Sequence, residues 1–465
     1  MKHFKADGMW WLPEESQRRV PGTLTFDDNG LELVLHDALR EFVSPAPGTA
    51  GVATSGWKVE PIIFGTSHDD RDFTVFDAGG DNLTGPFARV QEVHFPEMVL
   101  EGCHAVGDDF AEVLCAFNYL DAWSDPPTIL VDGPDRRRAH VTLEVQELAT
   151  ATIAGASVRL VCGVEGTSGD ARVDLTRWTS FAITLDAPAT AKGSIRSYVR
   201  PLQDLLTFCT GRPVRLTSLR LRPTDESEPR EGPAEAFFAA VQPSERRPPT
   251  IGAVDNWTAP TILTMRNCPM PLGELLERWF ALWQQRTDVL TLLLSPLYAP
   301  FIYSEHGFAS AFQCAEALHD LVLPTRDVTK AEHAARLASI TQALESAHVA
   351  ADTVAWATNV LRSRNDKPLS RKIDDLVRTT GAVGDAVLKA DERFGATASA
   401  ARAGVSHGGS DKTLDSTGRY WYGQALRWVT RASLLGELLD DASDAQRRVV
   451  EREAFLHTVA KIGAP

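Results

Sequence analysis

The stretch Arg402-Ala403-Gly404-Val405-Ser406-His407-Gly408-Gly409 closes a helical segment in the C-terminal half of this 465-residue chain. Paired glycines favour the left-handed conformation in which helices commonly stop, so the sequence predicts that His407 lies near a helix C-terminus, with Gly408 or Gly409 in the cap position. The dipole at that end favours a protonated imidazole. Arg402 precedes His407 by five residues, which is about 140° around a regular helix. The two side chains would therefore converge only if the helix unwinds near Gly404 or if two subunits share one site.

Apolar residues recur with a helical period on both sides of this stretch. The pattern begins at Pro271, and further helices are predicted over residues 305–323, 330–346, 353–362, 370–379 (with Ser370 as a cap), 383–403, 420–439 and 444–461. Few turns in this half resemble hairpins. Residues 251–465 are therefore expected to form an all-helical bundle.

Residues 1–222 have a different pattern, with short alternating runs that are typical of strands. These runs lie at 23–26, 31–35, 73–76, 88–93, 140–145 and 157–161, with one helix at 194–209 and a last strand at 214–221. The spacing predicts a sandwich or an open barrel. Residues 223–250 contain six prolines and read as a linker, in which the apolar patch 237–241 could dock as a short helix,. The expected fold class is α+β, with a β-rich domain followed by an all-α bundle.

The charge of the chain is unevenly distributed. The net charge is −15, whereas residues 251–465 hold 25 acidic and 23 basic side chains, a net charge of −2. Bulk attraction of nucleic acid by the acidic first half is therefore disfavoured, and a local basic patch in the second half remains possible. Six scattered cysteines predict free thiols in a reducing compartment,. With no apolar run long enough for a membrane span and no signal-peptide core, we expect a cytoplasmic protein.

Segments at both ends of the chain resemble one known family. Arg402-x-x-x-x-His407 in a helical bundle is similar to the HEPN domain, a ribonuclease domain of prokaryotic defence and toxin systems. The resemblance to ApeA-like proteins extends to the segments Gly8–Pro13, Pro21–Phe26, Trp279–Phe280, Phe312–His319 and Leu369–Leu376.

This resemblance implies an anti-phage abortive-infection ribonuclease, in which a β-rich sensor domain responds to a phage-derived trigger. It implies metal-independent RNA cleavage without a cofactor, with the 2′-hydroxyl as nucleophile, His407 as general acid or base and Arg402 holding the phosphate. It also implies a homodimer that pairs through the motif face. Ala403 departs from the family, which usually has a polar residue, often Asn, after the arginine. This departure leaves room for a slow or inactive nuclease.

Other polar residues are weaker candidates, each with a structural alternative. Glu316 and His319 lie three apart on one helical face, and they either approach the cleft or fix helix packing. Ser406 either binds phosphate or caps the helix. A basic cluster either steers RNA or is a solvated face, and it consists of Arg362, Arg364, Lys367, Arg371 and Lys372. The alternative functions are an inactive module that binds RNA or protein, and a toxin controlled by a separate antitoxin.

Overall fold

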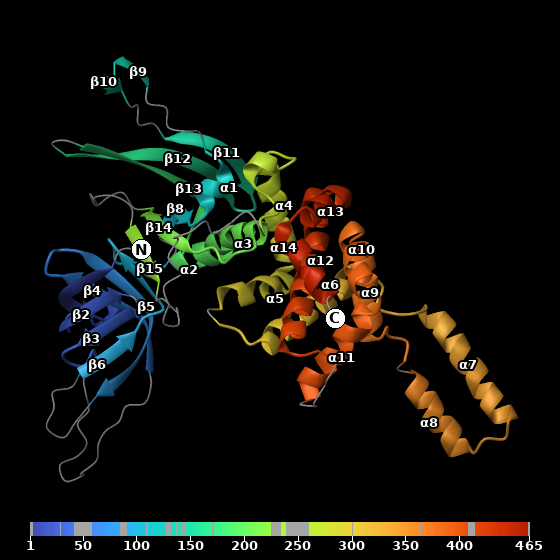
Figure 1. Ribbon diagram of the computed structural model, residues 1–465. Coiled ribbons are helices and arrows are strands. Elements are labelled where there is room, and N and C mark those ends of the chain that lie inside the picture. The colour runs from blue at the N-terminus through green and yellow to red at the C-terminus, as the bar shows by residue number, and fades with distance from the viewer. Residues whose placement is uncertain are drawn as a thin grey trace, which may run out of the picture. The chain divides into compact units, whose positions relative to one another are not determined.

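The computed structural model describes residues 3–463 apart from 28, 41–57, 84–90, 108–109, 127–131, 136–137, 141–144, 170–171, 225–233, 239–259, 300, 363 and 408–413. The chain divides into two compact units. The first contains Met1–Thr207, Val214–Asp255 and Thr264–Phe280, and the second contains Phe208–Pro213, Asn256–Leu263 and Ala281–Pro465. Figure 1 shows the strands of the first unit in blue and green and the helices of the second mostly in yellow to red.

The first unit is built on a closed β-barrel. Its strands pair antiparallel in the order β5-β4-β1-β2-β3-β6, and β6 pairs again with β5, which closes the ring. Of the two predicted architectures, a sandwich and an open barrel, the structure is nearer the barrel, which is closed. The strands are β1 (Phe4–Trp11), β2 (Val20–Asp27), β3 (Gly30–Leu35), β4 (Lys58–Ser67), β5 (Asp72–Leu83) and β6 (Gln91–Phe95).

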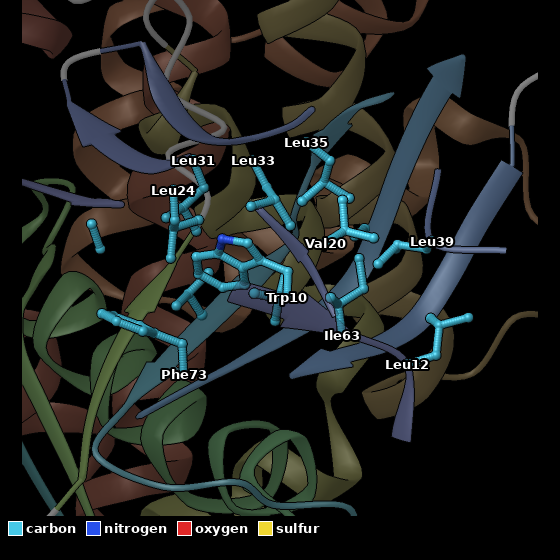
Figure 2. Packing of buried hydrophobic residues seen from close by; sticks show 14 of the residues in the cluster. Trp10, Leu12, Val20, Leu24, Leu31, Leu33, Leu35, Leu39, Ile63 and Phe73 are labelled. Carbon is cyan, nitrogen blue, oxygen red and sulfur yellow. The ribbon is translucent and has the colours of Figure 1, made fainter. Parts of the chain in front are cut away.

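The interior of this barrel is filled by apolar side chains from alternating strand positions. Trp10 is fully buried among residues such as Leu24, Leu33 and Phe73, and Figure 2 shows them converging on the indole. Gly65 makes this packing possible, because a Cβ at that position would lie 2.1 Å from the Trp10 ring. The close approach of strand β4 to the indole therefore requires glycine at position 65.

The same sheet continues beyond the barrel through seven further strands. These are β7 (Met98–Glu101), β8 (Phe110–Phe117), β11 (Gln146–Ile153), β12 (Ala156–Gly169), β13 (Arg172–Ala189), β14 (Leu216–Pro223) and β15 (Ala234–Phe238). The strands β9 (Asp132–Asp135) and β10 (Arg138–His140) form a separate pair. The helical segments of this unit are η1 (Pro13–Glu15), α1 (Leu120–Ser124), α2 (Ala191–Ser194), a π-helical turn (Ile195–Val199), η3 (Met265–Asn267) and most of α3 (Arg200–Thr210), whose last three residues belong to the second unit.

The expected short helix at 237–241 is wrong for the part that the structure describes. Phe237 and Phe238 belong to strand β15, where they pair with Val99 and Met98 of β7. A short apolar run has no clear period, so the free edge of β7 decides its structure. This strand also lies inside the segment expected to be a linker. Residues 239–241, half of the strand predicted at 88–93 and most of the strand predicted at 140–145 fall outside the described residues.

The second unit is a helical bundle around α12 (Ser416–Leu439), which packs on α6, α13 and α14. The other helices are α4 (Leu272–Gln285), which begins in the first unit, α5 (Thr287–Tyr298), α6 (Ser304–Val322), α7 (Lys330–Ser346), α8 (Ala351–Arg362), α9 (Leu369–Thr379), α10 (Ala382–Ala390), α11 (Phe394–His407), α13 (Ala442–Val450) and α14 (Glu453–Ile462). The predicted all-α bundle is therefore confirmed. Among the described residues, no helix combines the length and the apolar character that crossing a membrane requires.

Several helix boundaries differ from those expected. The helix predicted over 383–403 is two helices, because Asp391 adopts an extended conformation between α10 and α11. The helix predicted over 444–461 breaks at Arg452, which is also extended. Helix α5 was missed, because its nearly continuous apolar run hides the period,. Ser370 does not cap α9, since Pro368 occupies the cap position.

None of the six cysteines is in a disulfide among the described residues, and five of them are buried. Burial raises the pKa of the Cys314 thiol to about 12. This thiol therefore stays protonated at neutral pH and is not an activated nucleophile.

Candidate functional site

Helix α11 carries the Arg402–His407 motif and buries one of its faces. Phe394, Ala398 and Ala401 are fully buried, and Gly395 lies beside them on the same side. Arg402 lies seven positions, about two turns, after Gly395 and is therefore on the same side of the helix. Arg402 is half-buried, whereas Ala403 is exposed. Arg402 makes no hydrogen bond or ion pair with another described residue, so its guanidinium is not held by a carboxylate there.

The helix continues through Gly404 to His407 without a break. Of the two ways in which Arg402 and His407 could converge, unwinding near Gly404 is therefore not observed. On a continuous helix the two positions stay about 140° apart. The side chains of Ser406 and His407 lie outside the described residues. Their roles remain predictions, including the choice between phosphate contact and capping for Ser406.

The first turn of α11 is docked tightly on α9. A Cβ at Gly395 would lie 2.4 Å from both the Ser370 carbonyl oxygen and Asp374 Oδ1. The Gly395 N–H donates to Asp374 Oδ1 over 3.0 Å. Burial raises the pKa of the Asp374 carboxyl, and the Gly395 N–H opposes this by favouring the carboxylate,. This contact sets where the motif helix starts.

Aromatic packing holds the same turn against α12. The Phe394 ring stacks on Tyr422 with a centroid distance of 5.0 Å and an interplanar angle of 4°. The Tyr422 hydroxyl donates to Asp391 Oδ2 over 2.7 Å, which also fixes the extended residue before α11. Burial, with this bond to Asp391, raises the pKa of the Tyr422 phenol. The start of α11 is thus fixed on two sides.

Glu316 and His319 share one face of α6, as their spacing predicted, and meet α9 through Lys372. His319 is fully buried, and its Nδ1 lies 2.9 Å from Asp320 Oδ1. Lys372 Nζ lies 2.7 Å from Asp320 Oδ2 and 3.7 Å from Glu316 Oε1. Burial alone would raise the pKa of Asp320, but hydrogen bonds from Lys372 and His319 hold it below its usual value.

This network suits a packing role, and none of its described bonds reaches Arg402. His319 Nε2, however, is buried without a hydrogen-bond partner among the described residues. A role near the cleft therefore stays a prediction. Sequence reasoning missed Asp320, although its position beside His319 and four residues after Glu316 was a usable signal.

The predicted basic cluster is divided by its ion pairs. Lys367 and Arg371 both pair with Asp375, at 2.6 and 3.4 Å, and Lys372 pairs with α6. Arg362 and Arg364 are exposed, and neither forms an ion pair with a described residue. Of this cluster, the positive charges without an ion pair to a described residue are therefore those of Arg362 and Arg364, at the end of α8. Whether the cluster steers RNA stays a prediction.

Comparison with known proteins agrees with this architecture. A family model described as Apea-like HEPN matches residues 309–441, which include Arg402 and His407. The helical bundle is therefore a HEPN domain. A second model, ApeA N-terminal domain 1, matches residues 5–252, more than half of the chain.

The chain thus belongs to the ApeA family, with a β-rich N-terminal region followed by a HEPN domain. This confirms the resemblance seen in the sequence. No curated protein and no solved structure matches the chain. At the level of the family, membership supports an anti-phage HEPN nuclease.

Proposed function

We propose that this protein is an anti-phage ribonuclease that cleaves RNA through Arg402 and His407 without a metal ion. The observation that carries the proposal is the state of Arg402 within the HEPN match: it is half-buried near the end of α11 and is engaged by no other described residue. A half-buried cation without a carboxylate partner among the described residues is suited to binding an anion. We further propose that a phage-derived trigger acts on the N-terminal unit and that cleavage arrests growth.

The reaction is an internal phosphoryl transfer. The 2′-oxygen forms a bond to the adjacent phosphorus, and the bond from phosphorus to the 5′-oxygen breaks. His407 takes the proton from the 2′-hydroxyl or delivers one to the leaving oxygen. The planar fork of Arg402 stabilises the charge that builds on the phosphate oxygens. The products are a 2′,3′-cyclic phosphate and a 5′-hydroxyl, and DNA resists because it lacks the nucleophile.

A homodimer supplies the geometry that one helix does not. Positions 402 and 407 are about 140° apart on the continuous α11, so a cleft lined by the motifs of two chains can bring Arg402 of one near His407 of the other,. In this arrangement Ser406, Glu316 and His319 are supporting residues.

A catalytically inactive module that binds RNA or protein is the second candidate. Ala403 favours it, because this exposed position lacks the polar side chain that is usual after the motif arginine. Such a module would bind RNA and leave it intact.

Purified full-length protein and its Arg402→Ala and His407→Ala variants test the proposal on labelled single-stranded RNA. Arg393→Ala and His36→Ala are matched controls, since both side chains are exposed and outside the motif. We expect each motif variant to lose about 100-fold or more of the cleavage rate and the controls to keep it. Cleavage should persist in a chelator, and DNA should survive.

The outcomes separate the two candidates. Equal cleavage by the wild type and both motif variants would show that the catalytic assignment is wrong. RNA binding in a mobility-shift assay without cleavage, both in vitro and in phage-infected cells, would favour the inactive module.

A further inference from the structure

Arg427 of α12 is a half-buried cation that forms no ion pair with a described residue. Its Nη2 donates to the Gly307 carbonyl oxygen over 3.4 Å, which is long for a hydrogen bond,. Its Nε is buried without a hydrogen-bond partner among the described residues. Burial lowers the pKa of this guanidinium, because it withdraws the charge from water,. A cation in this state, with donors to spare, is suited to binding an anion.

The segment before α6 places exposed aromatic rings beside this cation. Phe301 is 71% exposed and Tyr303 is 63% exposed. Their rings meet edge to face, with a centroid distance of 4.9 Å and an interplanar angle of 84°. A Cβ at Gly307 would lie 3.8 Å from Ile302 Cγ2 and 3.5 Å from Arg427 Nη2. The segment 301–303 and the guanidinium are therefore neighbours at the start of α6.

Tyr420 extends the same surface along α12. It precedes Arg427 by seven positions, about two turns, so the two lie on one side of the helix. Its side chain is 48% exposed. The carboxylate of Glu305, in the first turn of α6, is already held by Arg419 at 3.1 Å. Phe301, Tyr303, Tyr420 and Arg427 together are called the α6–α12 surface.

We propose that the α6–α12 surface binds single-stranded RNA, with bases stacked on its exposed rings and a phosphate group on Arg427. Every base has a π-face, so aromatic rings hold a single strand with little regard to sequence. The planar fork of a guanidinium matches the oxygens of a phosphate. A second copy of this chain fits less well, because a two-fold contact would bring another Arg427 to the first one and no carboxylate from this surface.

The α6–α12 surface is within reach of the proposed catalytic residues. Helix α6 packs on both α11 and α12 (Figure 1). Seven residue steps join His407, at the end of α11, to Leu414, just before α12, so these residues lie within about 25 Å of each other,. An RNA of several nucleotides can therefore contact this surface and the motif together. The inference rests on the proposed function, since it names the surface that holds the substrate of that site.

Binding can be measured apart from cleavage with an RNA that the site cannot cut. A fluorescent 2′-O-methyl RNA of about eight nucleotides keeps its bases and phosphates but lacks the 2′-hydroxyl nucleophile. Fluorescence anisotropy with the full-length protein gives the dissociation constant. We expect Phe301→Ala, Tyr303→Ala and Tyr420→Ala each to raise it by about fivefold or more, because each removes a stacking ring. Tyr303→Phe and Tyr420→Phe keep the ring and should bind like the wild type.

The salt dependence of binding tests the phosphate contact on Arg427. For a single strand, each neutralised phosphate contributes about 0.7 to the slope of the logarithm of affinity against the logarithm of salt concentration. Arg427→Gln should therefore lower this slope by about 0.7, and Arg427→Lys, which keeps the charge, should leave it unchanged. The three alanine variants should also keep the wild-type slope. A general loss of structure would not divide the variants in this way.

Two matched controls lie on the α7–α8 hairpin. Trp356→Ala removes a ring that is 66% exposed, and Arg336→Gln removes an exposed cation. The first should leave the dissociation constant unchanged, and the second should leave the salt slope unchanged. Sedimentation velocity should give every variant the mass of the wild type.

Four results would overturn the proposal. They are a wild type that does not bind the RNA, alanine variants that bind like the wild type, an unchanged slope in Arg427→Gln, and a loss in Trp356→Ala as large as that in the alanine variants. A lower mass in the alanine variants would instead identify the surface as a contact between copies. Cleavage by Arg402→Ala and His407→Ala at the wild-type rate would refute the catalytic assignment and leave the binding result standing.

Discussion

Gly395→Ala should disturb the proposed site without touching its motif. The new methyl group would lie 2.4 Å from the Ser370 carbonyl oxygen, which is backbone and cannot rotate away. An ordinary carbon–oxygen contact needs roughly 3.3 Å or more, so α11 must move away from α9 by about 1 Å. Overpacking of this kind costs typically 1–3 kcal/mol, and strain on the bond to Asp374 adds to it. We expect the free energy of unfolding to fall by about 2–4 kcal/mol in total.

Activity should fall more than stability alone explains. A misplacement of about 1 Å at a catalytic group can cost about 100-fold in rate. Urea denaturation followed by circular dichroism measures stability, and cleavage of labelled RNA at a temperature where the variant remains folded measures activity. Gly436→Ala is the matched control, because a Cβ there would meet Ala442 at 3.5 Å, an ordinary contact. It should keep full activity and gain up to about 1 kcal/mol from helix propensity.

The reasoning is refuted if Gly395→Ala proves as stable and as active as Gly436→Ala. A variant that is destabilised but cleaves RNA at the wild-type rate while folded would show that the docking of α11 on α9 does not affect the proposed site. In that case the position of the first turn of α11 would not set the position of Arg402.

Two further predictions concern the interior of the bundle. Lys372→Met removes the cation shared by Asp320 and Glu316, and the free energy of unfolding should fall by about 1 kcal/mol at neutral pH in urea titrations, since both carboxylates are partly exposed,. The folded state lowers the pKa of Asp320, so this contribution is present above the unfolded value near 3.9 and is lost as pH falls through the lower folded value,. The difference in the free energy of unfolding between Lys372→Met and the wild type should therefore disappear below about pH 4. A difference that persists there would contradict a stabilising ion pair between Lys372 and Asp320. Phe312→Ala opens a cavity at a fully buried position of α6 and should cost about 3–5 kcal/mol, and a loss below about 1 kcal/mol would argue against this core,.

Local signals predicted much of the fold. Helix α7 begins and ends where it was expected, and Thr329 and Glu332 form a capping box at its start,. The hairpin between β2 and β3 was marked by alternation on both sides of Asp27 and Gly30. In both cases the residues that decide the structure are neighbours in the sequence.

Other features depend on residues far apart in the chain. Asp391 breaks a helical pattern because Tyr422, 31 residues later, donates to its carboxylate. Strand β15 forms because the edge of β7 is available to it. Closure of the barrel depends on the second pairing of β6 with β5. Periodicity within a short window contains none of this information.

In the candidate site, too, features set by neighbouring residues could be predicted and features set by distant residues could not. The sequence placed Arg402 near the end of a helix, and α11 continues through it to His407. It did not indicate that Arg402 follows the packed side of α11, because this depends on Gly395 meeting α9. Glycine at a position that looks like an ordinary helix start was the available signal, and only the contact with Ser370 and Asp374 gives it meaning.

The position of α11 therefore depends on α9, and α9 is tied to α6 by Lys372. A shift of α9 by about 1–2 Å, typical of switching helices, would move the first turn of α11 with it. In the proposed dimer, Arg402 and His407 come from different chains, so a shift of α11 in one chain changes the distance between them across the cleft. A control signal would then not need to reach either motif residue directly, since a small change in the packing of α6 on α9 would be sufficient. On this reasoning Lys372→Met should alter the cleavage rate of the folded protein as well as its stability.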